Sequence, residues 1–236
     1  MNLLTTIQYV CGRTGLTVPS SVLGTTDTQV LQLLRLLEEE GDDLRKRGPW
    51  NVLVKEASWT STAAEDQGAM TTLASSGFSY MKPGTFWDRT DKLPIMGPLS
   101  DNEWQSRKAL GLSGPRYAWR ERGGKMLITP TPTAGHTFVF EYISTNWILG
   151  VDGTSYRQYF TLDTDTILLP EHLFLMGLRW RWKKEKGFDY AEDFRTYETQ
   201  VLDALGRDGG KPTLHLDGEP RRYGPGIFVP EMSWNL

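Results

Sequence analysis

The chain has 236 residues, of which 39% are hydrophobic and 23% are charged, as is ordinary for a soluble globular protein. Its formal net charge of -3 argues against a dedicated nucleic-acid binder, because such proteins carry a strong basic excess. A single cysteine, Cys11, excludes an internal disulfide framework and fits folding in a reducing cytoplasm.

The N-terminus lacks the basic start and apolar run of a signal peptide. No stretch approaches the roughly 18 apolar residues that are needed to span a bilayer. We therefore expect no membrane partner.

The first 49 residues are predicted to contribute two helices to a helical bundle. In residues 2–11, apolar side chains recur at helical spacing, namely at Leu3, Leu4, Ile7 and Val10. A second helix is predicted to begin at a capping box of Thr26 and Gln29 and to run to about Lys46. Gly48 and Pro49 then end it.

Residues 50–168 are predicted to form a β-rich insertion. Two strand-like runs, 117–122 and 125–129, flank Gly123-Gly124, and this pattern indicates a hairpin. The run 137–143 is a third strand, and the three together predict an antiparallel meander. Within the same region, a capping box of Ser100 and Glu103 predicts a short helix to Ala109.

Residues 169–208 are predicted to return to the helical bundle. Pro170 suits a first helical position, and Gly187 closes that helix. A capping box of Asp189 and Glu192 predicts the start of another helix, which runs to Gly206. The predicted fold class is therefore α+β: about four bundled helices, an inserted antiparallel β-meander domain and an extended C-terminal arm.

The arm is predicted to comprise residues 209–236, which contain repeated Gly and Pro and show neither a helix nor a strand period. Disordered, solvated tails lack large apolar residues, but this segment contains Tyr223, Ile227, Phe228, Val229, Met232 and Trp234. We expect these residues to be buried on a surface. That surface belongs either to the chain's own domain or to another subunit. The second is favoured because the segment is long and follows two completed helices.

The sequence contains no motif with useful specificity for chemistry. It has no phosphate-binding loop, dinucleotide fingerprint or nucleophile elbow. His136, His172 and His215 lie in three different contexts without metal-ligand spacing. We therefore assign no catalytic residue, no cofactor and no metal site.

A run of cations near the end of the helix that begins at 170 has two interpretations. Its members are Arg179, Arg181, Lys183, Lys184 and Lys186. Cations near a helix C-terminus interact favourably with the macrodipole, and this accounts for most of the run. Alternatively, Arg and Trp alternate here to present a basic, aromatic strip to nucleic acid or to an acidic surface of a partner.

This order of elements resembles that of the head-to-tail adaptor, or connector, proteins of tailed bacteriophages, especially short-tailed ones. The resemblance covers most of the chain and is one of order and character. It rests on residues 26–50, Phe86-Trp87-Asp88-Arg89, residues 117–142 and the two helices at 169–186 and 190–205.

The resemblance implies a non-enzymatic virion protein at the head–tail interface, assembled in the host cytoplasm. Such adaptors form a homo-oligomeric ring, commonly of twelve copies, beneath the portal protein and extend the DNA channel. The C-terminal arm is then expected to climb onto the portal. The other partners are a downstream tail or nozzle protein and DNA, which passes through the lumen without specific binding.

Two alternatives have other functions. The first is a different tail or head-completion component of the virion, with a β-sandwich docking domain. The second is a carbohydrate-cleaving enzyme with a carboxylate pair drawn from Asp88, Asp91 or Glu121. Those residues are supported only by being acidic and near Trp.

Overall fold

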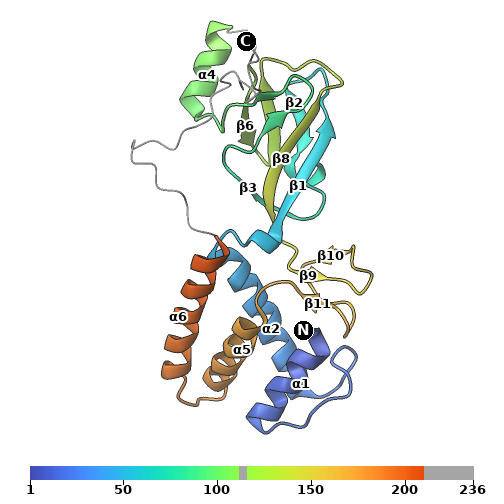
Figure 1. The fold of residues 1–236 in the computed structure, drawn as a ribbon, viewed down its shortest axis with the longest axis vertical. Coiled ribbons are helices and arrows are strands. Elements are labelled where there is room, and N and C mark those ends of the chain that lie inside the picture. The colour runs from blue at the N-terminus through green and yellow to red at the C-terminus, as the bar shows by residue number, and fades with distance from the viewer. Residues whose placement is uncertain (112–115, 210–236) are drawn as a thin grey trace, which may run out of the picture. The chain divides into compact units, whose positions relative to one another are not determined.

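A computed structural model describes residues 1–111 and 116–209 of the chain, which divide into two compact units. The first unit comprises Met1–Glu56, Ala74–Met81 and the stretch from Glu141 to the end of the described residues. The second comprises Ala57–Leu73 and Lys82–Phe140. Across both, the described residues form six α-helices and three antiparallel sheets, which confirms a mixed α+β composition (Figure 1).

Four helices of the first unit share one apolar core: α1 (Leu3–Thr14), α2 (Thr28–Arg47), α5 (Glu171–Glu185) and α6 (Ala191–Asp208). The spacing of apolar residues predicted all four, because one face of each helix must leave water. Each helix contributes buried side chains to this core, among them Ile7, Leu37, Phe174 and Val201. No helix in the described residues is long and apolar enough to cross a membrane.

The helix starts differ in detail from the predicted capping boxes. Asp27, not Thr26, caps α2, and its carboxylate accepts a hydrogen bond from the Gln29 N–H at 2.8 Å. An Asp side chain is at least as good a cap as Thr, so the neighbouring residue takes the role. At α6 the N-cap is Tyr190, which makes no side-chain capping bond, while Asp189 accepts from the Ala191 N–H.

A small sheet and a buried tryptophan complete the first unit. The sheet has the order β10 (Tyr156–Arg157), β9 (Ile148–Leu149), β11 (Thr166–Ile167). Directly before β9, Trp147 is fully buried and stacks on Phe174 of α5, with ring centroids 5.4 Å apart. This ring fixes the start of the small sheet against the helices. The short 3-10 helix Asn51–Leu53 follows α2.

The largest sheet has five strands. Its order is β1 (Val54–Thr60), β8 (Thr137–Ser144), β4 (Trp87–Asp88), β5 (Leu93–Pro94), and β3 (Phe78–Met81) also pairs with β8. Within the second unit its side chains form an aromatic core. Trp59 lies 5.6 Å from Phe86 and meets Phe138 edge to face at 5.8 Å, a favourable ring geometry.

The third sheet contains the predicted hairpin. Its order is β2 (Asp66–Ala69), β7 (Lys125–Thr129), β6 (Ala118–Arg122). Gly123 and Gly124 have φ of 60° and 70°, as a two-residue turn between β6 and β7 requires. The predicted meander is wrong in its third strand, because β8 pairs in the other sheet. Both edges of β7 are already taken by β2 and β6, so no edge remains for β8.

Two helices lie in the second unit, α3 (Met70–Leu73) and α4 (Asp101–Leu110). The capping box predicted for α4 is confirmed. The Ser100 N–H donates to the Glu103 carboxylate at 2.8 Å, and the Glu103 N–H donates to the Ser100 hydroxyl at 3.3 Å. Both otherwise unpaired donors are thereby satisfied.

Candidate functional site

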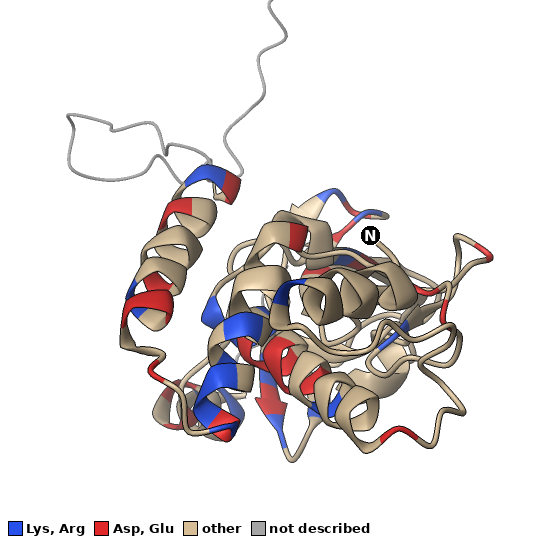
Figure 2. Cartoon of the chain, turned by 90° about the horizontal axis from the view of Figure 1, so that it is seen from below, with Lys and Arg blue, Asp and Glu red and all other residues tan. Residues whose placement is uncertain are grey.

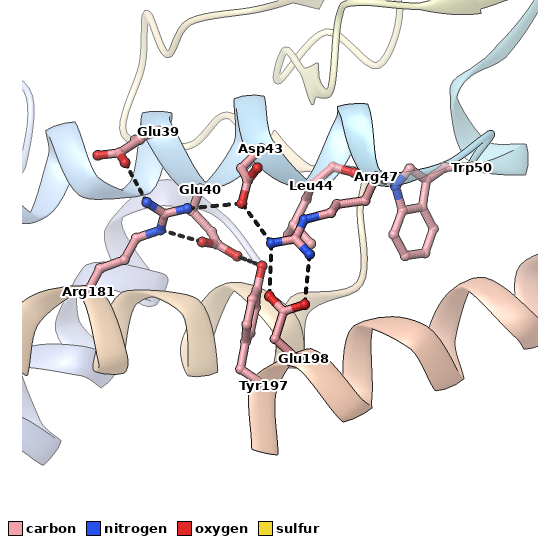
Figure 3. A network of polar contacts seen from close by, with 9 residues as sticks. All are labelled: Glu39, Glu40, Asp43, Leu44, Arg47, Trp50, Arg181, Tyr197 and Glu198. Carbon is pink, nitrogen blue, oxygen red and sulfur yellow. Dashed lines mark hydrogen bonds and ion pairs between the residues drawn. The ribbon is translucent and has the colours of Figure 1, made fainter. Parts of the chain in front are cut away.

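A buried arginine links α5 to α2 (Figure 3). Arg181 is only 8% exposed, and its guanidinium forms ion pairs with three carboxylates of α2. Its Nε lies 2.6 Å from Oε2 of Glu40, which is fully buried. Its other nitrogens contact Glu39 and, at 3.1 Å, Asp43. Arg181 is therefore a structural cation and does not belong to an exposed basic strip, contrary to that interpretation of the sequence.

The same network extends to α6. The Tyr197 hydroxyl donates to Oε1 of Glu40. Arg47 of α2 forms a two-pronged ion pair with Glu198, with N–O distances of 2.8 and 2.9 Å, and also contacts Asp43 at 3.2 Å. Charged hydrogen bonds thus connect three helices without a break, as Figure 3 shows.

Burial and charge determine the protonation of this network. Burial raises the pKa of the Glu40 carboxyl above its usual value, although hydrogen bonds from Tyr197 and Arg181 oppose the rise. Burial lowers the pKa of Arg181, but the bond to Glu40 and the surrounding negative charges outweigh this and raise it overall. Burial and the Glu40 charge also raise the pKa of Tyr197. Arg181 stays cationic and Tyr197 stays a hydrogen-bond donor at neutral pH.

The network is suited to holding the three helices in register. The buried groups Glu40, Arg181 and Tyr197 form hydrogen bonds with one another across the helix interfaces. Fully satisfied buried polar networks specify a unique packing arrangement. We assign it a structural role.

The other predicted basic residues lie at or near the surface of α5. Arg179 and Lys183 both form ion pairs with Asp193 of α6. Lys184 is exposed, and Lys186 is exposed with its Nζ 4.3 Å from the centre of the Trp182 ring. Basic and acidic residues therefore lie on neighbouring helices, as Figure 2 also shows.

Two of these cations line a cavity of about 290 Å³ on the first unit. Its walls come from α1, α5 and the link to α6 and combine cationic, aromatic and aliphatic groups: Tyr9, Val10, Arg13, Thr14, Leu175, Arg179, Trp182, Lys183 and Phe188. Sequence reasoning found Arg179 and Lys183 but missed Arg13, which is far away in the sequence. A cavity of this composition suits an acidic or aromatic group of a partner protein.

A second cluster lies in the second unit, where Asp88, Asp91 and His136 meet. Nδ1 of His136 lies 2.7 Å from Oδ2 of Asp88 and 3.6 Å from Oδ2 of Asp91. No spacing pattern in the sequence marks this group, because 48 residues separate Asp88 from His136. Glu121, the other acid considered for catalysis, lies on β6 and is not part of it.

A model of the SU10 adaptor protein family matches residues 1–225. The chain belongs to this family. No curated protein matches the chain. The match confirms the resemblance to phage head-to-tail adaptors and identifies a structural bacteriophage protein rather than a member of a known enzyme family. As an adaptor it is a virion component that associates with other phage head and tail proteins.

Apart from Gly209, the predicted arm of this adaptor lies outside the described residues. This applies to all six predicted anchors: Tyr223, Ile227, Phe228, Val229, Met232 and Trp234. The family match ends at residue 225, so it includes Tyr223 but not the other five. Of the residues predicted for assembly, the structure therefore describes the five cations between Arg179 and Lys186 but none of the six anchors.

Proposed function

We propose that this adaptor forms a homo-oligomeric ring of about twelve copies beneath the portal protein. In such a symmetric ring, each copy contacts its two neighbours through two different surfaces. Beneath the portal, the ring extends the DNA channel and joins the head to a downstream tail or nozzle protein. The family match over residues 1–225 carries this proposal. The net charge of -3 supports a lumen through which DNA slides without specific binding.

The helices of the first unit are proposed to form the bundle that packs around the ring. The closed charge network of α2, α5 and α6 supports this role, because it gives each copy a rigid helical body. The corresponding segments are residues 1–49 and 169–208. Residues 50–168 are the β-rich insertion, which faces outward or toward the tail.

The segment 209–236 is proposed to be an arm that docks on the portal. Large apolar side chains between prolines support this assignment, since such a chain can add as a strand or insert side chains into pockets. Docking on the adaptor's own ring is the competing arrangement.

Assembly with the portal tests the function. The adaptor is mixed with the portal protein of the same phage, and the product is imaged by electron microscopy. We expect a ring of adaptor copies on one face of the portal. Binding to a tail protein without any binding to the portal would identify a different tail or head-completion component instead.

Two variants, each with three alanine substitutions in the segment 209–236, test the arm. The triple change Ile227→Ala, Phe228→Ala, Trp234→Ala removes apolar anchors and is expected to abolish ring formation on the portal, since buried aromatic anchors dominate binding energy. The control triple change Asp217→Ala, Glu219→Ala, Arg221→Ala alters polar residues of the same segment and is expected to assemble normally. Normal assembly of the first variant would refute the arm.

A further inference from the structure

We propose that Asp88, Asp91 and His136 form a binding site for one divalent first-row transition-metal ion such as Zn²⁺. The ligand atoms are Oδ2 of each Asp and Nδ1 of His136, with water completing the coordination. This site is separate from the assembly function and does not depend on it.

The spacing of the three atoms fits a metal. Zinc binds nitrogen and carboxylate oxygen at about 2.0–2.2 Å, so two ligands lie about 3.0 Å apart at about 90° and about 3.4 Å apart at the tetrahedral angle. The distances from Nδ1 of His136 are 2.7 Å to Asp88 and 3.6 Å to Asp91, which bracket those values. All three ligand atoms lie within 4.8 Å of one another. Closure of the site around an ion requires a movement of the Asp91 carboxylate, whose side chain is half-exposed and free to turn.

Asp88 is held in place for this role. Its Oδ1 accepts the backbone N–H groups of Thr90 and Asp91, at 2.8 and 3.2 Å, which leaves Oδ2 directed at His136. The carboxylate is only 1% exposed and cannot turn away into solvent. A ligand fixed by other hydrogen bonds loses little freedom when a metal binds.

His136 is held equally firmly. The backbone N–H of His136 donates to the Ser61 hydroxyl at 3.0 Å, and its backbone carbonyl accepts from the Ser61 N–H at 2.8 Å. The rings of Tyr117 and Phe138 pack edge to face against the imidazole, with centroids 6.4 Å away in each case. Both the backbone and the ring of His136 are therefore preorganised.

The two ligand-bearing segments are also tied together. Asp88 of β4 pairs with Phe138 of β8, and the Arg89 N–H donates to the Thr137 carbonyl at 2.9 Å. The Thr137 N–H in turn donates to the Thr90 hydroxyl at 2.9 Å. An ion bound here would connect the turn after β4 to the start of β8 and stabilise a sheet whose β4 and β5 have only two residues each.

Charge and access favour a divalent transition ion. Once His136 has lost its proton, two carboxylates and a neutral imidazole give the site a charge of about two negative units, which a divalent ion neutralises. The imidazole nitrogen selects transition metals over Mg²⁺ and Ca²⁺, which prefer all-oxygen sites. Asp91 is 47% exposed and leaves an entry path from solvent.

A proton on His136 is the competing occupant. The hydrogen bond to Asp88 raises the pKa of His136, burial opposes this, and the charges of Asp88 and Asp91 raise it further. A metal must displace that proton, so Zn²⁺ binding should weaken as the pH falls, and the titration is run at a fixed pH of about 7.5.

The test is a titration of the full-length protein with Zn²⁺ by calorimetry, repeated with Mg²⁺. We expect one Zn²⁺ per chain and no heat from Mg²⁺. At a free Zn²⁺ concentration about 100 times Kd, the midpoint of thermal unfolding should rise by roughly 5–10 °C. Co²⁺ should give visible absorption bands with the same stoichiometry. Absence of Zn²⁺ binding would overturn the proposal and leave a proton-bridged Asp–His pair.

Variants separate this site from adventitious binding at other histidines. Asp91→Ala changes a half-exposed side chain and should remove Zn²⁺ binding while leaving the metal-free unfolding midpoint nearly unchanged. His136→Ala should also remove binding. The matched controls His172→Ala, on the exposed start of α5, and His215→Ala should retain it. Loss of binding in either control, with binding retained in Asp91→Ala, would place the ion elsewhere and refute the site.

Discussion

Arg181 shows how one side chain can connect helices that are distant in sequence. A guanidinium carries five N–H donors in a planar fork, so it can serve several carboxylates at once, which a lysine ammonium does less well. Here it meets Glu39, Glu40 and Asp43, which lie on adjacent turns of α2. Because Glu40 is fully buried, its charge depends on this single cation and on Tyr197.

Removal of the Arg181 side chain should therefore lower the free energy of unfolding far more than removal of a surface cation does. We expect Arg181→Met to lower the free energy of unfolding by about 3–5 kcal/mol, because Glu40 is left buried without its countercharge. The same change at Arg179, whose ion pair with Asp193 is 44% exposed on the arginine side, should cost no more than about 1 kcal/mol. Urea denaturation of both variants at neutral pH provides the comparison.

The loss of folding stability in Arg181→Met should also depend on pH in a defined direction. Burial already raises the pKa of Glu40, and removal of the cation raises it further. A carboxyl with a raised folded-state pKa contributes stability below its unfolded pKa of about 4.3, and this is lost as pH rises through the folded pKa. The deficit relative to wild type should thus be largest at neutral pH and shrink toward pH of about 5. A deficit that stays constant over this range would contradict the burial of an ionised Glu40.

At the scale of elements, two glycines allow close helix contacts. A Cβ built on Gly41 of α2 would lie 2.2 Å from the Trp147 ring, and one built on Gly177 of α5 would lie 2.2 Å from the Glu40 carboxyl. These separations are far below van der Waals contact. The absence of a side chain at both positions brings α2 against Trp147 and α5 against Glu40.

Gly41→Ala should consequently destabilise the fold even though alanine is the better helix former. We expect a loss of about 1–3 kcal/mol in the free energy of unfolding, because the rigid, buried Trp147 ring cannot move aside cheaply. The control Gly12→Ala in α1 has nothing within 4 Å of the added methyl and should gain about 0.5–1 kcal/mol. Thermal and urea unfolding of the two variants should therefore shift in opposite directions. A gain in both would exclude the close contact at Gly41.

The sequence predicted helices correctly where the pattern involved residues close together in the chain. Periodic apolar residues predicted α1, α2, α5 and α6, and the Ser100–Glu103 capping box marked the start of α4. The partner of β8 was not predictable, because it depends on the second edge of β7 being occupied by β2, a strand that is remote in sequence. The contact between Asp88 and His136 was not predictable for the same reason, because the two residues are also remote in sequence.

The burial of Arg181 was also not predictable from the sequence pattern. Trp180, Arg181 and Trp182 are all buried, and three consecutive residues span about 200° of a helix. Helix α5 is therefore enclosed on most sides at this level, and an alternating Arg–Trp run does not indicate a surface strip there. Only the positions of α2 and α6 decide whether such an arginine is an exposed cation or a buried one.

At the scale of the whole molecule, the proposed arm poses a thermodynamic question. An arm that docks on a portal contributes nothing to the stability of the free adaptor, whereas an arm that docks on its own domain stabilises it. Full burial of one large apolar side chain contributes about 1.5–3 kcal/mol, and the segment offers six such anchors. The two arrangements therefore differ by an amount that is easily measured.

We expect a variant truncated after Gly209 to unfold at the same temperature as the full chain, within about 2 °C, when both are free of portal. Self-docking predicts a fall instead. Each 1 kcal/mol lost lowers the midpoint by about 2–4 °C for a domain of 150–250 residues, so even two buried anchors would be detected. Scanning calorimetry of both proteins at equal concentration makes the comparison. An unchanged midpoint together with lost portal binding would assign the burial of the arm to the partner, while a fall of many degrees would assign it to the adaptor itself.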